Sequence, residues 1–213
     1  MYGSNKYNVC MKDLKEYMTE GFKLGNNYKN PYNYHPKDRK ELKKLIEKLI
    51  EERGNEADLN DIDTFEITDM AYLFYDSKFD GDISRWDVSN VENMFRMFER
   101  STFNGDISEW DVSNVKDMEG MFYTSEFDGD LSQWNVGNVN VMYCMFCGSK
   151  YTGKNGDISN WDVSNIKNMK YMFVKSGFDG DISKWKINKN CSIDDMFKNC
   201  PLEGKEPKWY VNK

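Results

Sequence analysis

The sequence predicts an α/β repeat solenoid, a leucine-rich-repeat-like stack of right-handed coils of about 24 residues each. Tryptophan recurs along the chain at intervals of 24, 24, 27 and 24 residues. Two columns of methionine and one of phenylalanine repeat with the same period. A single coil of about 24 residues is too short to bury its own apolar face, so neighbouring coils must stack to form a continuous core. The repeating tryptophans are Trp86, Trp110, Trp134, Trp161 and Trp185.

Residues 1–57 form the predicted N-terminal lead-in and helical cap. The stretch from Pro36 to Gly54, PKDRKELKKLIEKLIEERG, has apolar residues at helical spacing, with proline before the helix and glycine after it. This helix is expected to cover the open edge of the first coil, since the end of a solenoid otherwise exposes core residues. A weaker helical pattern runs from Met11 to Phe22.

Residues 58–200 hold about six copies of the repeat, of which FDGDISRWDVSNVENMFRMF is one. Its pattern I-x-x-W-x-V-x-x-V is close to the leucine-rich pattern L-x-x-L-x-L-x-x-N. A short parallel strand from Arg85 to Val88 is expected, with Trp86 and Val88 directed into the core. Asn93 then stands where a helix N-cap would, before M-x-x-M-F on one face of a helical turn. Each coil is therefore predicted to contain a short parallel strand and a short helix, joined by turns.

Two columns permit a binding interpretation beside a structural one. Aspartates that repeat with the coils are similar to a cation ladder, but the G-G-x-G-x-D-x-U-x period of calcium-binding coils is absent, which favours Asx turns. The tryptophan column would stack on sugars if it were exposed, whereas strand alternation places it in the core. A glycan ligand is therefore the less favoured alternative. The aspartates are Asp82, Asp106, Asp130, Asp157 and Asp181.

An expansion of three residues within Ser149–Asp157, SKYTGKNGD, breaks the 24-residue period. Insertions in repeat proteins map to loops, often on a functional face. Alternatively, the segment is only a bulge that keeps Tyr151 in the phenylalanine slot. Both interpretations stay open at this point.

Residues 201–213 are predicted to be the C-terminal cap. The segment PLEGKEPKWY follows the last Met-Phe pair and ends the repeat. We interpret Trp209 within it as the one tryptophan outside the repeating column.

The charge balance excludes several partners. Residues 1–57 hold 12 Lys/Arg and 9 Asp/Glu, which gives this part a net charge of +3. Because the whole chain has a net charge of −7, residues 58–213 carry a net charge of −10. An acidic repeat region argues against nucleic acid, whose phosphates require a basic face. No run of about 18 apolar residues occurs, which predicts no membrane insertion. The N-terminus has no apolar segment typical of a signal peptide, so the localisation stays open.

The side chains that commonly perform catalysis or bind metals are sparse. His35 is the only histidine, so no histidine-based triad or histidine-rich metal centre is available. Cys144 and Cys147 form Cys-x-x-Cys, but zinc would also need Cys191 and Cys200 from other coils. We expect free thiols rather than zinc or an internal disulfide, with Cys191 in an outward slot. The sequence therefore predicts no enzyme activity and no cofactor.

The motif GDISxWDVSNVxxMxxMF resembles the repeat of the BspA-like leucine-rich-repeat surface proteins, a repeat once filed as a mycoplasma domain of unknown function. The resemblance covers roughly residues 36–210. It implies a leucine-rich-repeat-like solenoid with a binding or adhesion role, often at the surface of bacteria. It implies no enzyme activity.

The outward strand positions are the predicted partner face, because their residues vary between copies whose core positions repeat. The leading function is a non-catalytic protein-interaction or adhesion module with a protein partner. One alternative is an architectural subunit of a surface layer, filament or virion, and another is an intracellular effector or regulatory binding protein. The partner face comprises Arg85, Asp87, Glu109, Asp111, Gln133, Asn135, Asn160, Asp162, Lys184 and Lys186.

Overall fold

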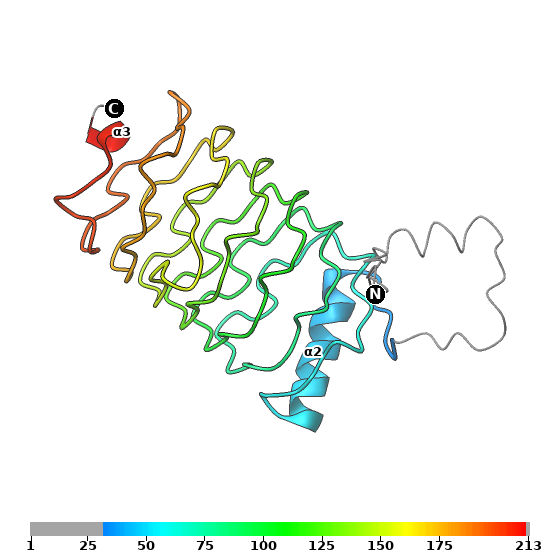
Figure 1. Ribbon diagram of the computed structural model, residues 1–213. Coiled ribbons are helices and arrows are strands. Elements are labelled where there is room, and N and C mark those ends of the chain that lie inside the picture. The colour runs from blue at the N-terminus through cyan, green and yellow to red at the C-terminus, as the bar shows by residue number, and fades with distance from the viewer. Residues whose placement is uncertain (1–31, 212–213) are drawn as a thin grey trace, which may run out of the picture. The chain divides into compact units, whose positions relative to one another are not determined.

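The computed structural model describes residues 32–211, so the helical pattern predicted from Met11 to Phe22 lies outside the described residues. Two helices occur in the described range, α2 at Arg39–Arg53 and α3 at Lys208–Val211. Between them the chain winds into successive coils that lie side by side from α2 to α3 (Figure 1). Within residues 32–211 the only β-structure is a set of isolated parallel bridges.

The helix α2 lies inside the range predicted to be helical and has suitable residues at both ends. The Asp38 carboxylate accepts a hydrogen bond from the Glu41 N–H at 2.8 Å, which satisfies one of the free N–H groups of the first turn. Gly54 follows the last helical residue with φ +90°, a conformation that favours glycine. One face of α2 packs into the same buried cluster as the coils. The buried residues of that face are Leu42, Ile46 and Leu49.

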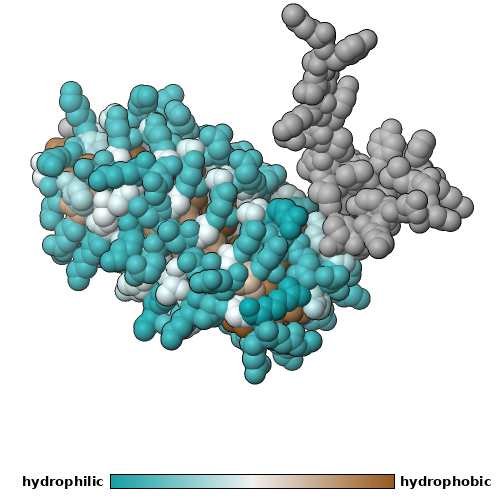
Figure 2. Space-filling view, turned by 60° about the horizontal axis from the view of Figure 1, so that its bottom comes forward, coloured by the Kyte–Doolittle hydropathy of each residue, from teal (hydrophilic) through white to brown (hydrophobic). Residues whose placement is uncertain are grey.

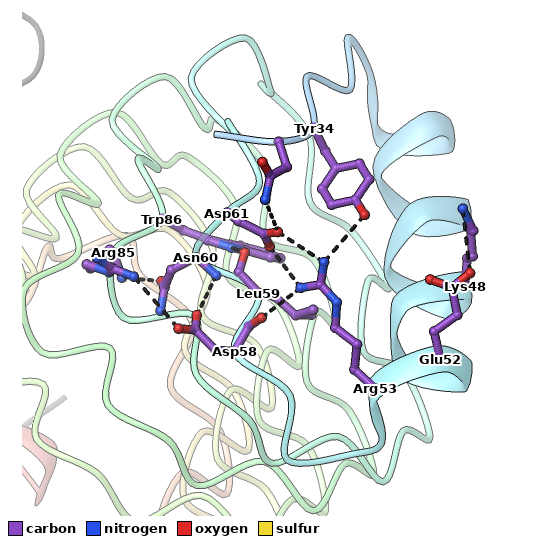
Figure 3. Close-up of polar contacts among 11 residues, drawn as sticks. Tyr34, Lys48, Glu52, Arg53, Asp58, Leu59, Asn60, Asp61, Arg85 and Trp86 are labelled. Atoms are coloured by element: carbon purple, nitrogen blue, oxygen red, sulfur yellow. Dashed lines mark hydrogen bonds and ion pairs between the residues drawn. The ribbon is translucent and has the colours of Figure 1, made fainter. Parts of the chain in front are cut away.

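Arg53, the last residue of α2, joins the helix to the first coil (Figure 3). Its guanidinium donates to both carboxylate oxygens of Asp61 at 3.0 Å and also contacts the Tyr34 hydroxyl at 3.4 Å. The hydrogen bond from Arg53 lowers the pKa of Asp61, although partial burial acts in the opposite direction. This forked pair fixes the end of α2 against the chain that follows it.

Isolated parallel bridges join equivalent positions of successive coils. Asp69 bridges to Asn93, and Asn93 bridges to Asp117, 24 residues further on. Beyond the bridges, alternate N–H groups donate to carbonyls of the next coil, as the N–H of Arg96 does to Glu119 at 2.9 Å. Each coil is therefore held to its neighbour by backbone hydrogen bonds as well as by side-chain packing.

The short helix predicted in each coil is wrong. In the M-x-x-M-F segments, the N–H groups that do not reach the next coil donate three residues back, as Met97 does to Met94 at 3.2 Å. Arg96 lies between them with φ +51°, and the equivalent residues of the other coils also have positive φ. Because an α-helix needs negative φ and donation four residues back, these segments are consecutive turns. Asn93 caps such a turn by accepting from the Phe95 N–H at 2.9 Å.

The strand predicted from Arg85 to Val88 is also absent, although the predicted sides of its residues are correct. Trp86 and Val88 are 4% and 1% exposed, whereas Arg85 is exposed. The backbone here closes local turns, since the Trp86 N–H donates to Ile83 at 3.1 Å and the Val91 N–H donates to Val88 at 2.9 Å. The parallel bridges form at other positions of the coil.

Aromatic rings from successive coils stack in columns. Phe98 and Phe122 lie with ring centroids 5.6 Å apart and planes 2° apart, and Trp86 and Trp110 lie 6.4 Å and 1° apart. All five tryptophans of the predicted column are 3% or 4% exposed, which confirms the interpretation that they belong to the core. Burial of such rings supplies a large part of the hydrophobic stabilisation.

Trp209 continues the tryptophan column, so its predicted place outside the column is wrong. It follows Trp185 by 24 residues, and the two rings stack with centroids 6.3 Å apart. Along the column each indole N–H donates to a carbonyl of the preceding coil, as Trp110 does to Ile83 at 3.2 Å. Trp209 makes the same bond to Ile182 at 2.9 Å, so α3 supplies the last member of the column.

The aspartate and asparagine columns stabilise turns. Asp106 accepts a hydrogen bond from the Ser108 N–H at 3.0 Å, and the other four predicted aspartates accept in the same way, which confirms the Asx-turn interpretation. The Asn114 amide donates to the Ser89 carbonyl of the preceding coil at 2.7 Å. These bonds satisfy backbone groups at the bends of the coils.

The expansion at Ser149–Asp157 keeps Tyr151 in the phenylalanine slot, as one of the two interpretations predicted. Its ring is 0% exposed and stacks between Phe127 and Phe178, with centroids 6.4 and 6.0 Å away. Its hydroxyl has no hydrogen-bond partner among the described residues. Burial raises the pKa of Tyr151, with a smaller contribution from nearby carboxylates.

Candidate partner face

The first row of the predicted partner face is exposed along its whole length. Arg85, at the start of the row, lies 3.8 Å from the Asp58 carboxylate of the preceding coil (Figure 3). Neither residue of that pair is shielded, so the pair contributes little to stability. The side chains of this row therefore remain available to a partner. They are Arg85, Glu109, Gln133, Asn160 and Lys184.

The second row is Asp87, Asp111, Asn135, Asp162 and Lys186, and its first four members have a structural task that was not predicted from the sequence. The Asp111 carboxylate accepts a hydrogen bond from the Ser113 N–H at 3.1 Å, and Asp162 accepts from Ser164 at the same distance. Asp87 and Asn135 make equivalent bonds to their own turns. Because one oxygen of each side chain caps a turn, a partner can contact the remaining acceptor sites of the aspartates and the amide N–H groups of Asn135.

The structure brings four of the predicted residues together around a hollow of about 480 Å³ between two neighbouring coils. Asn160 and Asp162 come from one coil, and Lys184 and Lys186 come from the next. Hydrogen bonds from Ser164 lower the pKa of Asp162, and the charge of Lys186 contributes in the same direction. The hollow thus offers one carboxylate and two ammonium groups, which suits a polar, charged partner surface. Glu109, Asp111, Gln133 and Asn135 belong to preceding coils and do not line it.

A second hollow, of about 540 Å³, follows the asparagine column. This hollow was not predicted from the sequence. Lys116 and Lys167 project among the asparagines, and Lys116 forms a 2.7 Å ion pair with Glu92. The column amides donate to backbone carbonyls, as Asn138 does to Ser113 at 2.7 Å, and each such bond uses one of the two N–H groups of the amide.

A third hollow, of about 590 Å³, lies where α2 meets the first coil and has a basic rim. Lys40 and Lys44 are exposed there, and Lys43 donates to the Tyr72 carbonyl at 3.1 Å. Tyr75 in this hollow is 44% exposed. The many lysines of the helix could have indicated this basic rim from the sequence. The prediction considered only the apolar face of the helix. The face of the molecule shown in Figure 2 is mainly hydrophilic.

The chain matches a known family model. The family model described as "Mycoplasma protein of unknown function, DUF285" matches residues 40–155 and again residues 124–212. The two ranges together cover most of the chain. The chain belongs to the DUF285 family. No curated protein and no solved structure matches it.

The cysteines of this DUF285 protein differ in exposure. Cys144 and Cys147 are partly exposed, whereas Cys191 and Cys200 are 3% and 8% exposed. The outward slot predicted for Cys191 is therefore wrong, and its N–H closes a turn onto Asn188 at 2.9 Å. The four are free thiols, and no group of three or more potential ligands that could hold a metal ion occurs within residues 32–211.

In the described part of the DUF285 chain, neither helix is long and apolar enough to cross a bilayer. α2 spans 15 residues and carries charged side chains on its exposed side. A membrane-spanning helix needs about 20 mostly apolar residues.

Proposed function

We propose that this DUF285 protein is a BspA-like, leucine-rich-repeat-like solenoid that acts as a non-catalytic protein-interaction or adhesion module. The observation that carries this proposal is the difference between the inside and the outside of the coils. Buried positions repeat the same residue types and pack in columns, whereas the exposed first row of the partner face changes from coil to coil. A surface that varies on a constant scaffold is typical of repeat proteins that bind macromolecules.

The order of charges along the partner face supports a protein partner. Glu109 and Asp111 make the second of its five coils acidic, and Lys184 and Lys186 make its last coil basic. A partner with the complementary order would bind in one direction only, because reversed docking would place like charges together. Such a face is more polar than a sugar-stacking platform, since the column tryptophans beneath it are buried.

The architectural alternative makes a different prediction. A filament or layer subunit must associate with copies of itself through the ends or sides of the stack. Molecular mass measured by light scattering at micromolar concentration tests it, and a strict monomer would count against it.

The structure allows a sharper experiment for the interaction module. Asp111 and Asp162 are poor choices for charge reversal because they cap turns. Glu109→Lys and Lys184→Glu change exposed side chains for which no structural role is seen. Glu126→Lys makes the same charge change at another exposed position further along the coil and serves as the matched control.

The bait is the full chain, and candidate partners are captured from cells or surface extracts of the source organism. The proposal predicts that one protein is captured by the parent and by the Glu126→Lys variant. The same protein should not be captured by the Glu109→Lys variant or by the Lys184→Glu variant. Equal capture by all four proteins would contradict the assignment of this face, provided that their melting temperatures agree.

A further inference from the structure

Two of the thiols lie within one closed turn. The Cys147 N–H donates to the Cys144 carbonyl at 3.1 Å. Residues that close such a turn have Cα atoms within about 7 Å of one another, and a disulfide needs a Cα separation of about 4.4 to 6.8 Å. The backbone therefore already brings the two cysteines to a separation that suits a bond between them.

The core holds this turn in place. Met145 and Phe146, the two residues between the cysteines, are 0% exposed. The Phe146 ring stacks on Phe122 and Phe173 with centroids 5.5 and 5.6 Å away. Because these rings anchor the turn, the folded chain keeps the two cysteines at this separation.

The two thiols are chemically different from each other and from the other cysteines of the coils. A hydrogen bond from the Cys144 thiol lowers the pKa of Cys147, and the Lys175 ammonium acts in the same direction against partial burial. The hydrogen bond to Cys147, burial and the Cys147 charge raise the pKa of Cys144. Cys147 is thus the better-stabilised thiolate, and Cys144 lies beside it. Cys191 and Cys200 are buried.

We propose that Cys144 and Cys147 form a thiol–disulfide exchange site that reacts with low-molecular-weight disulfides. The Cys147 thiolate attacks one sulfur of the small disulfide, forms a mixed disulfide and releases one thiolate. Cys144 then loses its proton to solvent or to the released thiolate and attacks the Cys147 sulfur. The second small thiolate leaves as the Cys144–Cys147 bond forms. Two electrons pass from the protein thiols to the small disulfide, which becomes two thiols.

The site does not depend on the proposed binding function. Cys144 lies in an M-x-x-M-F segment, Cys147 directly follows it, and neither belongs to the partner face. The bond would join two side chains of one turn, so the reaction is expected to change the surface of one coil without unfolding the stack. The redox experiment can therefore fail while the partner-binding experiment succeeds, and the reverse also holds.

Intact-mass spectrometry of the folded, full-length chain tests the proposal, with Cys10→Ser in every variant so that the cysteine outside the described residues does not react. After incubation with glutathione disulfide, the parent should lose about 2 Da and carry no adduct. Cys144→Ser should trap one glutathione on Cys147, and Cys147→Ser should react at least about tenfold more slowly. Cys200→Ser is the matched control and should behave as the parent does.

Tryptophan fluorescence and the melting temperature establish that each variant is folded. If Cys147→Ser does not fold, alkylation of the parent by iodoacetamide replaces it, and fragmentation should show Cys147 labelled before Cys144. Stable glutathione adducts on the parent without an internal disulfide would overturn the proposal. Equal labelling of the two cysteines would also overturn it.

Discussion

The indole N–H of Trp209 donates to the Ile182 carbonyl at 2.9 Å, 27 residues earlier in the chain. The indole of Trp185 makes the same bond to Ile158 at 3.0 Å, also across 27 residues. The segment after the last Met-Phe pair therefore repeats the packing of a coil, and it covers the edge that the last full coil would otherwise expose.

Removal of Trp209 should destabilise the end of the stack. Trp209→Ala loses the ring that covers Trp185, and we expect the free energy of unfolding in urea to fall by about 2 kcal/mol, because the ring is only partly buried. Trp209→Phe keeps a stacking ring and loses the hydrogen bond, for a fall of about 1 kcal/mol. Trp110→Ala, in the middle of the column, should cause a larger fall of about 3–5 kcal/mol. Parent-like stability of Trp209→Ala would show that α3 does not cover the column.

Replacement of Tyr151 by phenylalanine should stabilise the protein. The hydroxyl is buried without a hydrogen-bond partner among the described residues, and the other members of its column are phenylalanines. We expect Tyr151→Phe to raise the free energy of unfolding by about 1 kcal/mol at neutral pH. A decrease would mean that the hydroxyl is solvated in solution.

The same substitution should change the response to alkaline pH. Burial raises the folded-state pKa of Tyr151 above that of the unfolded chain, so the folded state keeps a proton that the unfolded state releases. Stability should therefore fall as the pH rises above about 10. Tyr151→Phe should reduce this fall, and the exposed Tyr75→Phe should not. Chemical denaturation at a series of pH values measures both, and identical slopes in all three proteins would contradict the assignment.

A side chain at Gly120 should lower stability, although the equivalent positions Arg96 and Cys144 carry side chains at positive φ. The φ of Gly120 is +58°, and an added Cβ would lie 3.1 Å from the Arg96 Cγ of the preceding coil. Gly120→Ala should lower the free energy of unfolding by about 1–2 kcal/mol. Gly137→Ser is the control because Gly137 occupies a slot that serine fills in other copies, and its effect should stay within about 0.5 kcal/mol. Equal effects in thermal melts of the two variants would show that the positive φ is not required.

The pair of Arg53 and Asp61 should make the attachment of α2 sensitive to acid. The folded-state pKa of Asp61 is lowered, chiefly by the hydrogen bond from Arg53, so its contribution is present above about pH 4 and is lost as the pH falls. A double-mutant cycle with Arg53→Met and Asp61→Asn should give a coupling of about 1 kcal/mol at pH 7 that disappears near pH 2.

The exposed pair of Lys48 and Glu52 on α2 provides the comparison for this cycle. Its N···O distance is 3.6 Å, and both side chains are more than half exposed (Figure 3). The equivalent cycle should give about 0.5 kcal/mol or less. A coupling at Arg53 and Asp61 as small as this would show that the forked contact does not form in solution.

Much of the candidate site could be predicted from the sequence because exposure follows the repeat. The columns place Glu109 and Lys184 outside and Trp110 inside, and the structure agrees. The turn-capping role of the second row could not be predicted, because an outward aspartate occupies the same repeat position whether its carboxylate is free or caps its own turn. Only the 3.1 Å bond from the Ser113 N–H to Asp111 reveals the difference.

The sequence by itself determined the period, the buried columns and the Asx turns, since each depends on residues that recur or on contacts within a few positions. It also contained the 24-residue interval between Trp185 and Trp209, which the interpretation of Trp209 as outside the column did not use. These features need no knowledge of which coil lies beside which.

Tertiary structure decided between helices and turns within the coils. A pattern such as M-x-x-M-F states which side chains are buried, but it does not state where the backbone N–H groups donate. The Arg96 N–H reaches the Glu119 carbonyl of the next coil, and the chain takes φ +51° at Arg96. A hydrogen bond to a neighbouring coil replaces the one that a helix would make within itself, and that choice depends on a stacked neighbour that no single repeat contains.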